Sequence, residues 1–247
     1  MGIRPSMQKM MARHLTLADA SVCELGDQFV GTKNGRIVAR KWYQAQGCAR
    51  YMSIDANGLN GAVPFDLNLA LYVNSDHRVM LTPDSELIER FDIVTDFGTG
   101  EHIWNQNQVW QTLHELCKSN GHIVFDRPTQ GYGGHCFYLL DRSVIAAFCH
   151  FNDYTPIWIG RAQTTRGELL RGILLKQGDV HGRNRPFVTP QQGRYFKHLS
   201  PIMDRQDHSR GPDYRSNELI RHGLVGKKPP PLADERTDKG IWEDEPE

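Results

Sequence analysis

Apolar and polar positions alternate along the first half of the chain in short segments, most of which end at a glycine, an asparagine or an aspartate. Segments that predict β-strands lie at residues 21–25, 51–54, 62–65, 91–97 and 122–125. Residues 36–46 and 102–118 instead carry apolar side chains at the three- and four-residue spacing of a helix. Alternation of this kind predicts a mainly parallel sheet with crossover helices.

The second half of the chain begins with the same pattern and then loses it. Residues 141–152 predict a helix, and residues 154–160 and 169–176 predict two strands that close the sheet as an antiparallel pair. After residue 176 apolar clusters are sparse, and the Lys-Lys-Pro-Pro-Pro run at residues 227–231 cannot continue a helix. We therefore expect an α/β domain over residues 1–176 and an extended, partly disordered arm over residues 177–247.

Composition narrows the class of protein. Lysine and arginine together number 29, as do aspartate and glutamate, so the net charge is zero and nucleic-acid binding is not expected. The first 17 residues contain no continuous apolar run of the secretory type, and no segment approaches the roughly 20 apolar residues that span a bilayer. The five cysteines include no CxxC pair, which favours a reducing compartment. We expect a cytoplasmic protein that does not bind membranes.

Acidic and glycine residues follow several of the predicted strands. Ligands of open α/β sheets bind at the carboxyl ends of the strands, so these residues are candidates for a binding site. They are Glu24, Gly26 and Asp27 after the first strand, Asp55 after the second, Asp66 after the third, and Asp96, Glu101 and His102 at and after the fourth. A glycine there lets a ligand approach the backbone, and a carboxylate can accept hydrogen bonds from both hydroxyls of a ribose.

The segments that contain these residues resemble the motifs of class I S-adenosylmethionine-dependent methyltransferases. They read CELGDQ, YMSID, VPFDLN, FDIVTDFGTGEHIWNQ and SNGHIVFDRP, and the resemblance covers roughly residues 18–176. It is greatest to members of sugar and small-molecule pathways whose fourth motif contains Gly-Thr-x-Glu-His. The first motif is reduced, because it carries Gly26 alone where the family has a run of glycines.

The resemblance implies a Rossmann-like methyltransferase fold and S-adenosylmethionine as the cofactor. It also implies a transferase that methylates a hydroxyl group of a small-molecule acceptor, such as a sugar. In the family's pattern, Asp55 matches the ribose-binding position and Asp66 the position near the adenine amino group. The residues assigned to cofactor binding are Glu24, Gly26, Asp27, Asp55, Asp66 and Asp96.

Three residues are candidates for catalysis. Glu101 and His102 open the helix after the fourth strand, and His135 lies in the glycine-rich segment GYGGHCFY after the fifth. His102 is a candidate general base, with Glu101 and His135 beside it. The alternatives are an ordinary helix N-terminus, where the dipole favours a glutamate, and a divalent-metal site shared with His135. Related methyltransferases with such a metal site have a further carboxylate that is not found here, so we assign no metal.

Two other functions stay open. One is a non-catalytic, methyltransferase-like scaffold, which the reduced first motif favours and in which the arm would wrap around a neighbouring subunit of a homo-oligomer. The other is a nicotinamide-dependent oxidoreductase, which needs a GxGxxG motif that the segment CELGDQFVGTKNG does not supply. A nucleic-acid methyltransferase is disfavoured by the neutral charge and by the lack of an Asn-Pro-Pro-aromatic motif.

Overall fold

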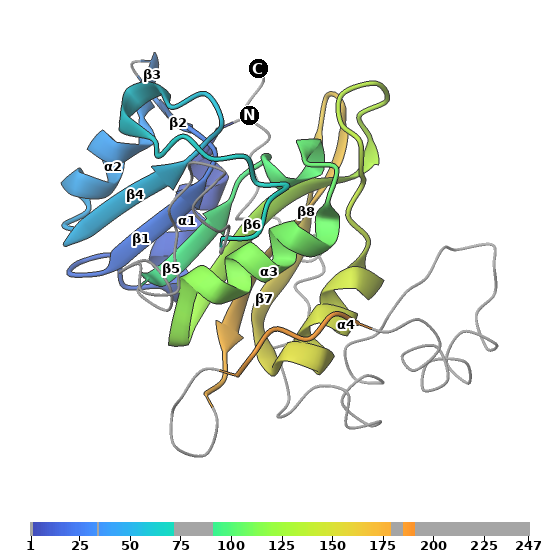
Figure 1. Cartoon of the computed structure of the whole chain (residues 1–247). Helices are drawn as coiled ribbons and strands as arrows, with labels where there is room; N and C mark the ends of the chain where they lie inside the picture. The colour runs from blue at the N-terminus through green and yellow to red at the C-terminus, as the bar shows by residue number, and fades with distance from the viewer. Residues whose placement is uncertain (1, 34, 72–90, 179–184, 191–247) are drawn as a thin grey trace.

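A six-stranded mixed sheet forms the centre of this computed structural model, which describes residues 2–33, 35–71, 91–178 and 185–190 (Figure 1). The strand order is β4-β1-β5-β6-β8-β7. The strands are β1 (Ser21–Leu25), β4 (Arg50–Ile54), β5 (Phe91–Asp96), β6 (Cys117–Gly131), β7 (Tyr154–Thr164) and β8 (Gly167–Lys176). Neighbours from β4 to β6 pair in parallel, whereas β8 pairs antiparallel with both β6 and β7. The predicted parallel sheet with a closing antiparallel pair is confirmed.

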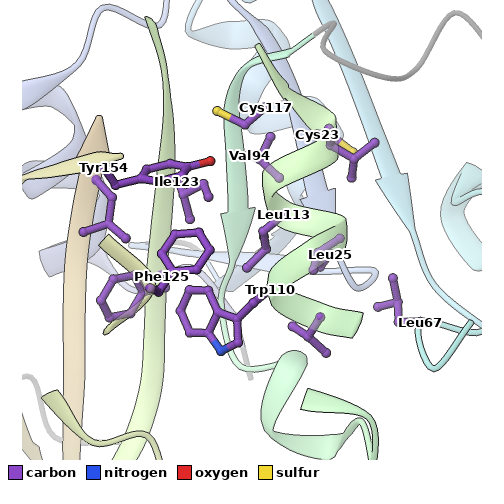
Figure 2. Close-up of a cluster of buried hydrophobic side chains, with 14 of the residues drawn as sticks. Cys23, Leu25, Leu67, Val94, Trp110, Leu113, Cys117, Ile123, Phe125 and Tyr154 are labelled. Carbon is purple, nitrogen blue, oxygen red and sulfur yellow. The ribbon is translucent and has the colours of Figure 1, made fainter. Parts of the chain in front are cut away.

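Helices cover both faces of the sheet. One core contains buried side chains from α1 (Pro5–His14) and α2 (Ala39–Ala45), and the other contains those from α3 (Gln106–Leu116) and α4 (Arg142–Asn152). Strand residues alternate between the two cores because successive side chains point to opposite faces. In β6, Val124 packs in the core of α1 and α2, while Ile123 and Phe125 pack under α3 (Figure 2).

Helices α3 and α4 both begin at side-chain caps. The Asn105 side chain accepts a hydrogen bond from the Gln108 backbone N–H at the start of α3, over 3.2 Å. The Asp141 side chain does the same for the Ser143 N–H at the start of α4, over 2.7 Å. Each cap satisfies a backbone donor that the first helical turn leaves without a partner. These caps fix where the loops before both helices end.

The amino-terminal region differs from the prediction. The sequence pattern indicated no element before residue 21, yet α1 forms there and buries Met7, Met10 and Met11. The helix predicted over residues 36–46 is shorter, because its first part forms β3 (Gly35–Val38), which pairs antiparallel with β2 (Phe29–Thr32). The pairing of β3 with β2 in a hairpin overrides the helical periodicity of this short segment.

Other elements shift in length. The helix expected from residue 102 begins at Gln106 and follows a 3-10 turn, η3 (Gly100–His102). The strand expected at residues 62–65 contributes a single bridge, between Val63 and Ile54, and is preceded by the 3-10 turn η1 (Leu59–Gly61). The sequence at residues 85–89 also indicates a short helix, and this segment lies outside the described residues. Within the described ranges, no helix is long and apolar enough to cross a membrane.

The described part of the predicted arm packs against the domain. The Val188 N–H donates to the Asn152 side chain over 2.7 Å, and the Asn152 amide donates back to the Val188 carbonyl over 3.0 Å. A ring nitrogen of His114 lies 2.7 Å from the Arg185 carbonyl oxygen, and the Phe187 ring meets the His114 ring edge to face at 5.8 Å. Residues 185–190 are therefore held on α3 and α4, while the rest of the arm beyond residue 178 lies outside the described residues.

A buried lysine closes the carboxyl end of α3. The Lys176 ammonium donates hydrogen bonds to the carbonyl oxygens of His114, over 2.6 Å, and Cys117, over 2.8 Å. Its side chain is 1% exposed. The last carbonyls of a helix have no intrahelical partner and carry the negative end of its dipole, so a cation there is stabilising. The lysine thus joins β8 to the carboxyl end of α3.

We expect Lys176→Met to lower the free energy of unfolding by about 2–4 kcal/mol, because it leaves two buried carbonyl oxygens without donors. The measurement is urea unfolding followed by circular dichroism. Lys41→Met is the matched control, since Lys41 is exposed on α2. Equal stability of the two variants would show that the Lys176 hydrogen bonds do not support α3.

Candidate functional site

The carboxyl ends of three parallel strands lie at one level of the sheet. The register pairs Leu25 at the end of β1 with Ile54 of β4 and with Asp96 of β5. The turns after these strands therefore begin side by side, at the edge where ligands of open α/β sheets bind. This edge brings together most of the residues that the sequence singled out.

The turns after β1 and β4 are joined through Asp55. One carboxylate oxygen of Asp55 accepts the Asp27 backbone N–H over 2.8 Å, and the other accepts the Asn57 N–H over 2.9 Å. The Asn60 side chain in turn donates to the Asp27 carboxylate over 2.6 Å. Asp55 is half-buried, and a carboxylate has about four acceptor positions. Two positions on Asp55 are thus left for a ligand, and Asp27 and Asp55 lie together as the sequence predicted.

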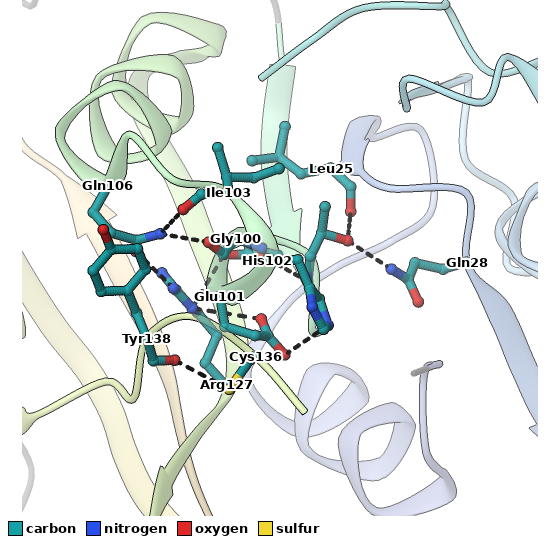
Figure 3. Close-up of polar contacts among 12 residues, drawn as sticks. Leu25, Gln28, Gly100, Glu101, His102, Ile103, Gln106, Arg127, Cys136 and Tyr138 are labelled. Carbon is teal, nitrogen blue, oxygen red and sulfur yellow. Dashed lines mark hydrogen bonds and ion pairs between the residues drawn. The ribbon is translucent and has the colours of Figure 1, made fainter. Parts of the chain in front are cut away.

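Gly26 begins the turn after β1 and has a backbone conformation that favours glycine, with φ of +92°. A Cβ atom on Gly26 would overlap the Thr99 hydroxyl oxygen, which donates a hydrogen bond to the Leu25 carbonyl over 2.9 Å. The Gln28 amide donates to that same hydroxyl over 2.8 Å (Figure 3). The Gln28 amide oxygen is buried, and among the described residues it has no hydrogen-bond donor. An acceptor that lacks a donor at this turn is suited to a ligand donor group.

Glu24 is in the core and not at the exposed strand end. Its carboxylate accepts hydrogen bonds from the Tyr51 hydroxyl over 2.6 Å and from the Thr95 hydroxyl over 3.4 Å, and it is fully buried. Residues of β1 alternate between faces, so Glu24 shares with Val22 the face covered by α1 and α2. Burial raises the pKa of Glu24 from about 4.5 to about 8. The predicted role in cofactor binding does not match this position.

Asp66 is exposed and stabilises its own turn. Its carboxylate accepts hydrogen bonds from the backbone and the side-chain amide of Asn68, over 2.9 Å and 2.8 Å. The Asn68 side-chain oxygen accepts the Asn105 backbone N–H over 3.0 Å, which connects this turn to the start of α3. The turn therefore sits beside the site, and its carboxylate is already engaged on one oxygen.

A buried cluster of charges lies where β5 ends. One oxygen of Asp96 accepts the backbone N–H groups of Thr99 and Gly100, over 3.1 Å and 2.9 Å. Its other oxygen is 3.7 Å from the Arg127 guanidinium, which is also 3.7 Å from the Glu101 carboxylate. Asp96, Glu101 and Arg127 are each at most 1% exposed. Asp96 thus shapes the turn from inside, and it does not project from the strand end.

Arg127 is the residue that sequence reasoning missed. It lies in β6, two residues after the buried Phe125. Its guanidinium donates a hydrogen bond to the Gln106 side chain over 2.7 Å and lies over the Trp110 ring of α3. The available signal was the Asp-Arg-Pro sequence that directly follows an apolar strand segment. A charged pair at such a position is usually exposed, so the pattern alone does not indicate burial.

Glu101, His102 and His135 come together as the sequence predicted. One donor atom from each lies within 4.8 Å of the others, and the two imidazole rings meet edge to face at 4.9 Å. The Glu101 carbonyl oxygen accepts the backbone N–H groups of Phe137 and Tyr138, which fixes the loop after β6 against η3. Burial, with the nearby Asp96, raises the pKa of Glu101, and burial with His135 lowers the pKa of His102.

Comparison with solved structures finds similarity to methyltransferases. A 1,6-didemethyltoxoflavin-N1-methyltransferase of Burkholderia thailandensis, with S-adenosylhomocysteine bound, is 15% identical with a TM-score of 0.47, over 70% of this chain and 77% of that one. The N-methyltransferase NodS of Bradyrhizobium japonicum WM9, also in complex with S-adenosylhomocysteine, is 15% identical with a TM-score of 0.44, over 70% and 88%. No protein-family model and no curated protein matches the sequence. Similarity at this level assigns no activity, so the function is argued from the chain's own residues.

The raised pKa of Glu24 predicts a pH-dependent stability. Between pH 4.5 and 8 the folded state holds a proton on Glu24 that the unfolded state releases, so stability falls as the pH rises through this window. The slope is at most ~1.4 kcal/mol per pH unit. We expect Glu24→Gln to remove this contribution, so that the variant gains stability relative to the native chain from pH 5 to pH 8. Thermal unfolding of both proteins across this range is the measurement, and parallel curves would contradict the prediction.

The turn after β1 predicts a specific intolerance of side chains. Gly26→Ala must relieve both a positive φ and the overlap with Thr99, so we expect a loss of about 2–4 kcal/mol in unfolding free energy. Gly133→Ala is the control, because a Cβ there meets no atom within 4 Å. Denaturant unfolding compares the two, and a neutral Gly26→Ala would show that the turn adapts.

Proposed function

We propose that this protein is an S-adenosylmethionine-dependent methyltransferase that methylates a hydroxyl group of a small-molecule acceptor, such as a sugar. The observation that carries the proposal is the juxtaposition at one sheet edge of the Gly26 turn, the half-exposed Asp55 carboxylate and the Glu101–His102–His135 group. The first two suit a nucleoside cofactor, and the third suits an acceptor group next to it.

The residues at the edge fit this cofactor. Gly26 brings bare backbone to the turn, and Asp55 has two acceptor positions left for the vicinal hydroxyls of a ribose. The Gln28 amide oxygen is a buried acceptor to which none of the described residues donates, which suits the charged amino group of the cofactor's methionine part. In the sequence pattern, Asp66 matches the adenine side, and its turn is anchored to α3 through Asn68.

The cofactor would supply a methyl group on a positively charged sulfur, and the transfer is an in-line displacement. The protein's contribution is then mainly to hold two reactants in line and to exclude water. Asp55 and the Gly26 turn hold one reactant, whereas His102 and His135 face the side that is left for the acceptor. His102 is 41% exposed on its side chain, so an acceptor can reach it.

One observation favours a second function, that of a non-catalytic scaffold. Thr99 and Gln28 place side chains over the Gly26 turn and hydrogen-bond to each other there. A first turn that is filled by the chain's own side chains offers a cofactor less room than a run of glycines does. The scaffold reading therefore predicts a folded protein that does not bind the cofactor.

We expect S-adenosylhomocysteine to bind the full chain with one site, and Asp55→Asn to weaken this binding at least tenfold. The loss follows because the variant gives up one acceptor oxygen and the negative charge that would bind the ribose hydroxyls. Isothermal titration calorimetry measures both affinities, and thermal unfolding confirms that the variant is folded.

Asp19→Asn is the matched control. Asp19 is exposed in the turn before β1, at the opposite edge of the sheet, and has a positive φ of 61° that asparagine also tolerates. Its variant should bind like the native chain. If the folded native chain shows no saturable binding, the methyltransferase proposal fails and the scaffold function is favoured.

A further inference from the structure

Two imidazoles and one carboxylate converge beside the proposed acceptor side. Glu101 and His102 come from η3, and His135 comes from the loop after β6, so residues more than 30 positions apart in the sequence supply the three donors. Their donor atoms lie within 4.8 Å of one another. Among the described residues, this is the group of histidine and acidic side chains that has the spacing of a metal site.

The Glu101 carboxylate lacks the partners that a buried anion requires. The residue is fully buried, yet neither oxygen accepts a hydrogen bond from any described residue. The nearest cation, Arg127, is 3.7 Å from one oxygen, beyond hydrogen-bond length, and is shared with Asp96. A buried carboxylate in this condition is costly unless a cation or a donor completes its coordination.

His135 also has a buried polar atom, Nε2, without a hydrogen-bond partner among the described residues. Its backbone N–H donates to the Tyr132 carbonyl over 3.0 Å, which holds the residue in a tight turn beside η3. Two side chains that point into one place, each with an unpaired atom, indicate that a ligand belongs between them.

We propose that Glu101, His102 and His135 bind one divalent transition-metal ion of the Zn²⁺ or Co²⁺ type. Two imidazole nitrogens and one carboxylate oxygen form a donor set that such ions prefer over Mg²⁺, and it leaves at least one coordination position open. Donors of a tetrahedral ion with bonds of about 2.1 Å lie about 3.4 Å apart. The donor separations must therefore shorten by up to about 1.4 Å, and His102, whose side chain is 41% exposed, can approach the other two by rotating.

The site changes what the sequence alone predicts. The sequence assigned no metal, because no further carboxylate accompanies the Glu-His pair. In the structure three donors meet without one, and the nearest extra carboxylate, Asp96, is engaged by Arg127 and by two backbone N–H groups. Arg127 lies equally close to both carboxylates, but only Asp96 also accepts backbone hydrogen bonds, so Glu101 is the carboxylate left for the ion.

If the proposed function holds, the ion would also take part in binding the acceptor. An open position on the ion would bind a hydroxyl oxygen of the acceptor and lower its pKa, so that the hydroxyl can release its proton to solvent water near neutral pH before the oxygen takes the methyl group. The acceptor would then be a compound that offers a hydroxyl to a metal, and His102 would hold the ion instead of removing the proton directly. Metal binding itself does not depend on this step.

The experiment is a titration of the full chain, freed of metal by a chelator, with Co²⁺ followed by its visible absorption and with Zn²⁺ followed by calorimetry. We expect one ion per chain, and at least a tenfold weaker affinity in His135→Ala and in His102→Ala. His135→Asp, which restores a donor, should recover part of the affinity. His150→Ala is the matched control, because His150 lies on α4 outside the donor group.

Two results would overturn the proposal. One is the absence of stoichiometric binding to the native chain. The other is binding that persists in both cluster variants, or that falls in His150→Ala or Cys136→Ser, which would locate the ion elsewhere. Thermal unfolding of every variant shows that it is folded. S-adenosylhomocysteine binding is measured on the same samples, so a failure of the methyltransferase proposal is distinguishable from a failure of metal binding.

Discussion

Arg127 enters the core from β6 with its guanidinium 3.7 Å from both Asp96 and Glu101. The two carboxylates belong to the turn after β5 and to η3, and neither is exposed to water. Without the guanidinium they would repel each other in a medium of low dielectric constant, and at least one would have to take up a proton. The Gln106 side chain and the Trp110 ring place α3 against the same cation. The end of β5, η3 and α3 therefore adopt their positions around a single charge.

A second buried arginine contacts a carboxylate on the other face of the sheet. Asp126 accepts a hydrogen bond from Arg171 of β8 over 3.1 Å, and Arg171 also donates to Ser6 of α1. Because Asp126 and Arg127 are adjacent in β6, their side chains point to opposite faces. One strand thus supplies a charge to each core. Breaking either pair would leave an uncompensated charge in the core, which costs more than the intact pair contributes.

Local patterns predicted the elements whose signal lies within their own sequence. The strand at residues 91–97 and the helix at residues 141–152 were found nearly as expected, because each has a clear period and a cap or turn residue at its end. The helix α1 was missed although its three buried methionines lie at helical spacing, because the segment is short and gains its stability by docking on the sheet. The strand β3 was missed because its state depends on pairing with β2.

At the site, too, some residues were predictable from the sequence and others depend on the fold. Gly26, Asp27, Asp55 and the Glu101–His102–His135 group were predictable, because parallel strands in register bring their carboxyl ends to one edge. Glu24 was not, because its position depends on which face of the sheet the side chain points to, and one residue of parity decides this. Arg127 was not, because burial of a charge is set by partners that are distant in the sequence.

Glu101 connects the charge of Arg127 to the loop that carries His135. Its carbonyl oxygen accepts the N–H groups of Phe137 and Tyr138, and its carboxylate faces the two histidines. The position of this loop and the spacing of the three donors are therefore set by one residue. A shift of η3 that broke the two backbone hydrogen bonds would also separate Glu101 from His135. The geometry of the Glu101–His102–His135 group thus depends on the same buried cation that holds the end of β5.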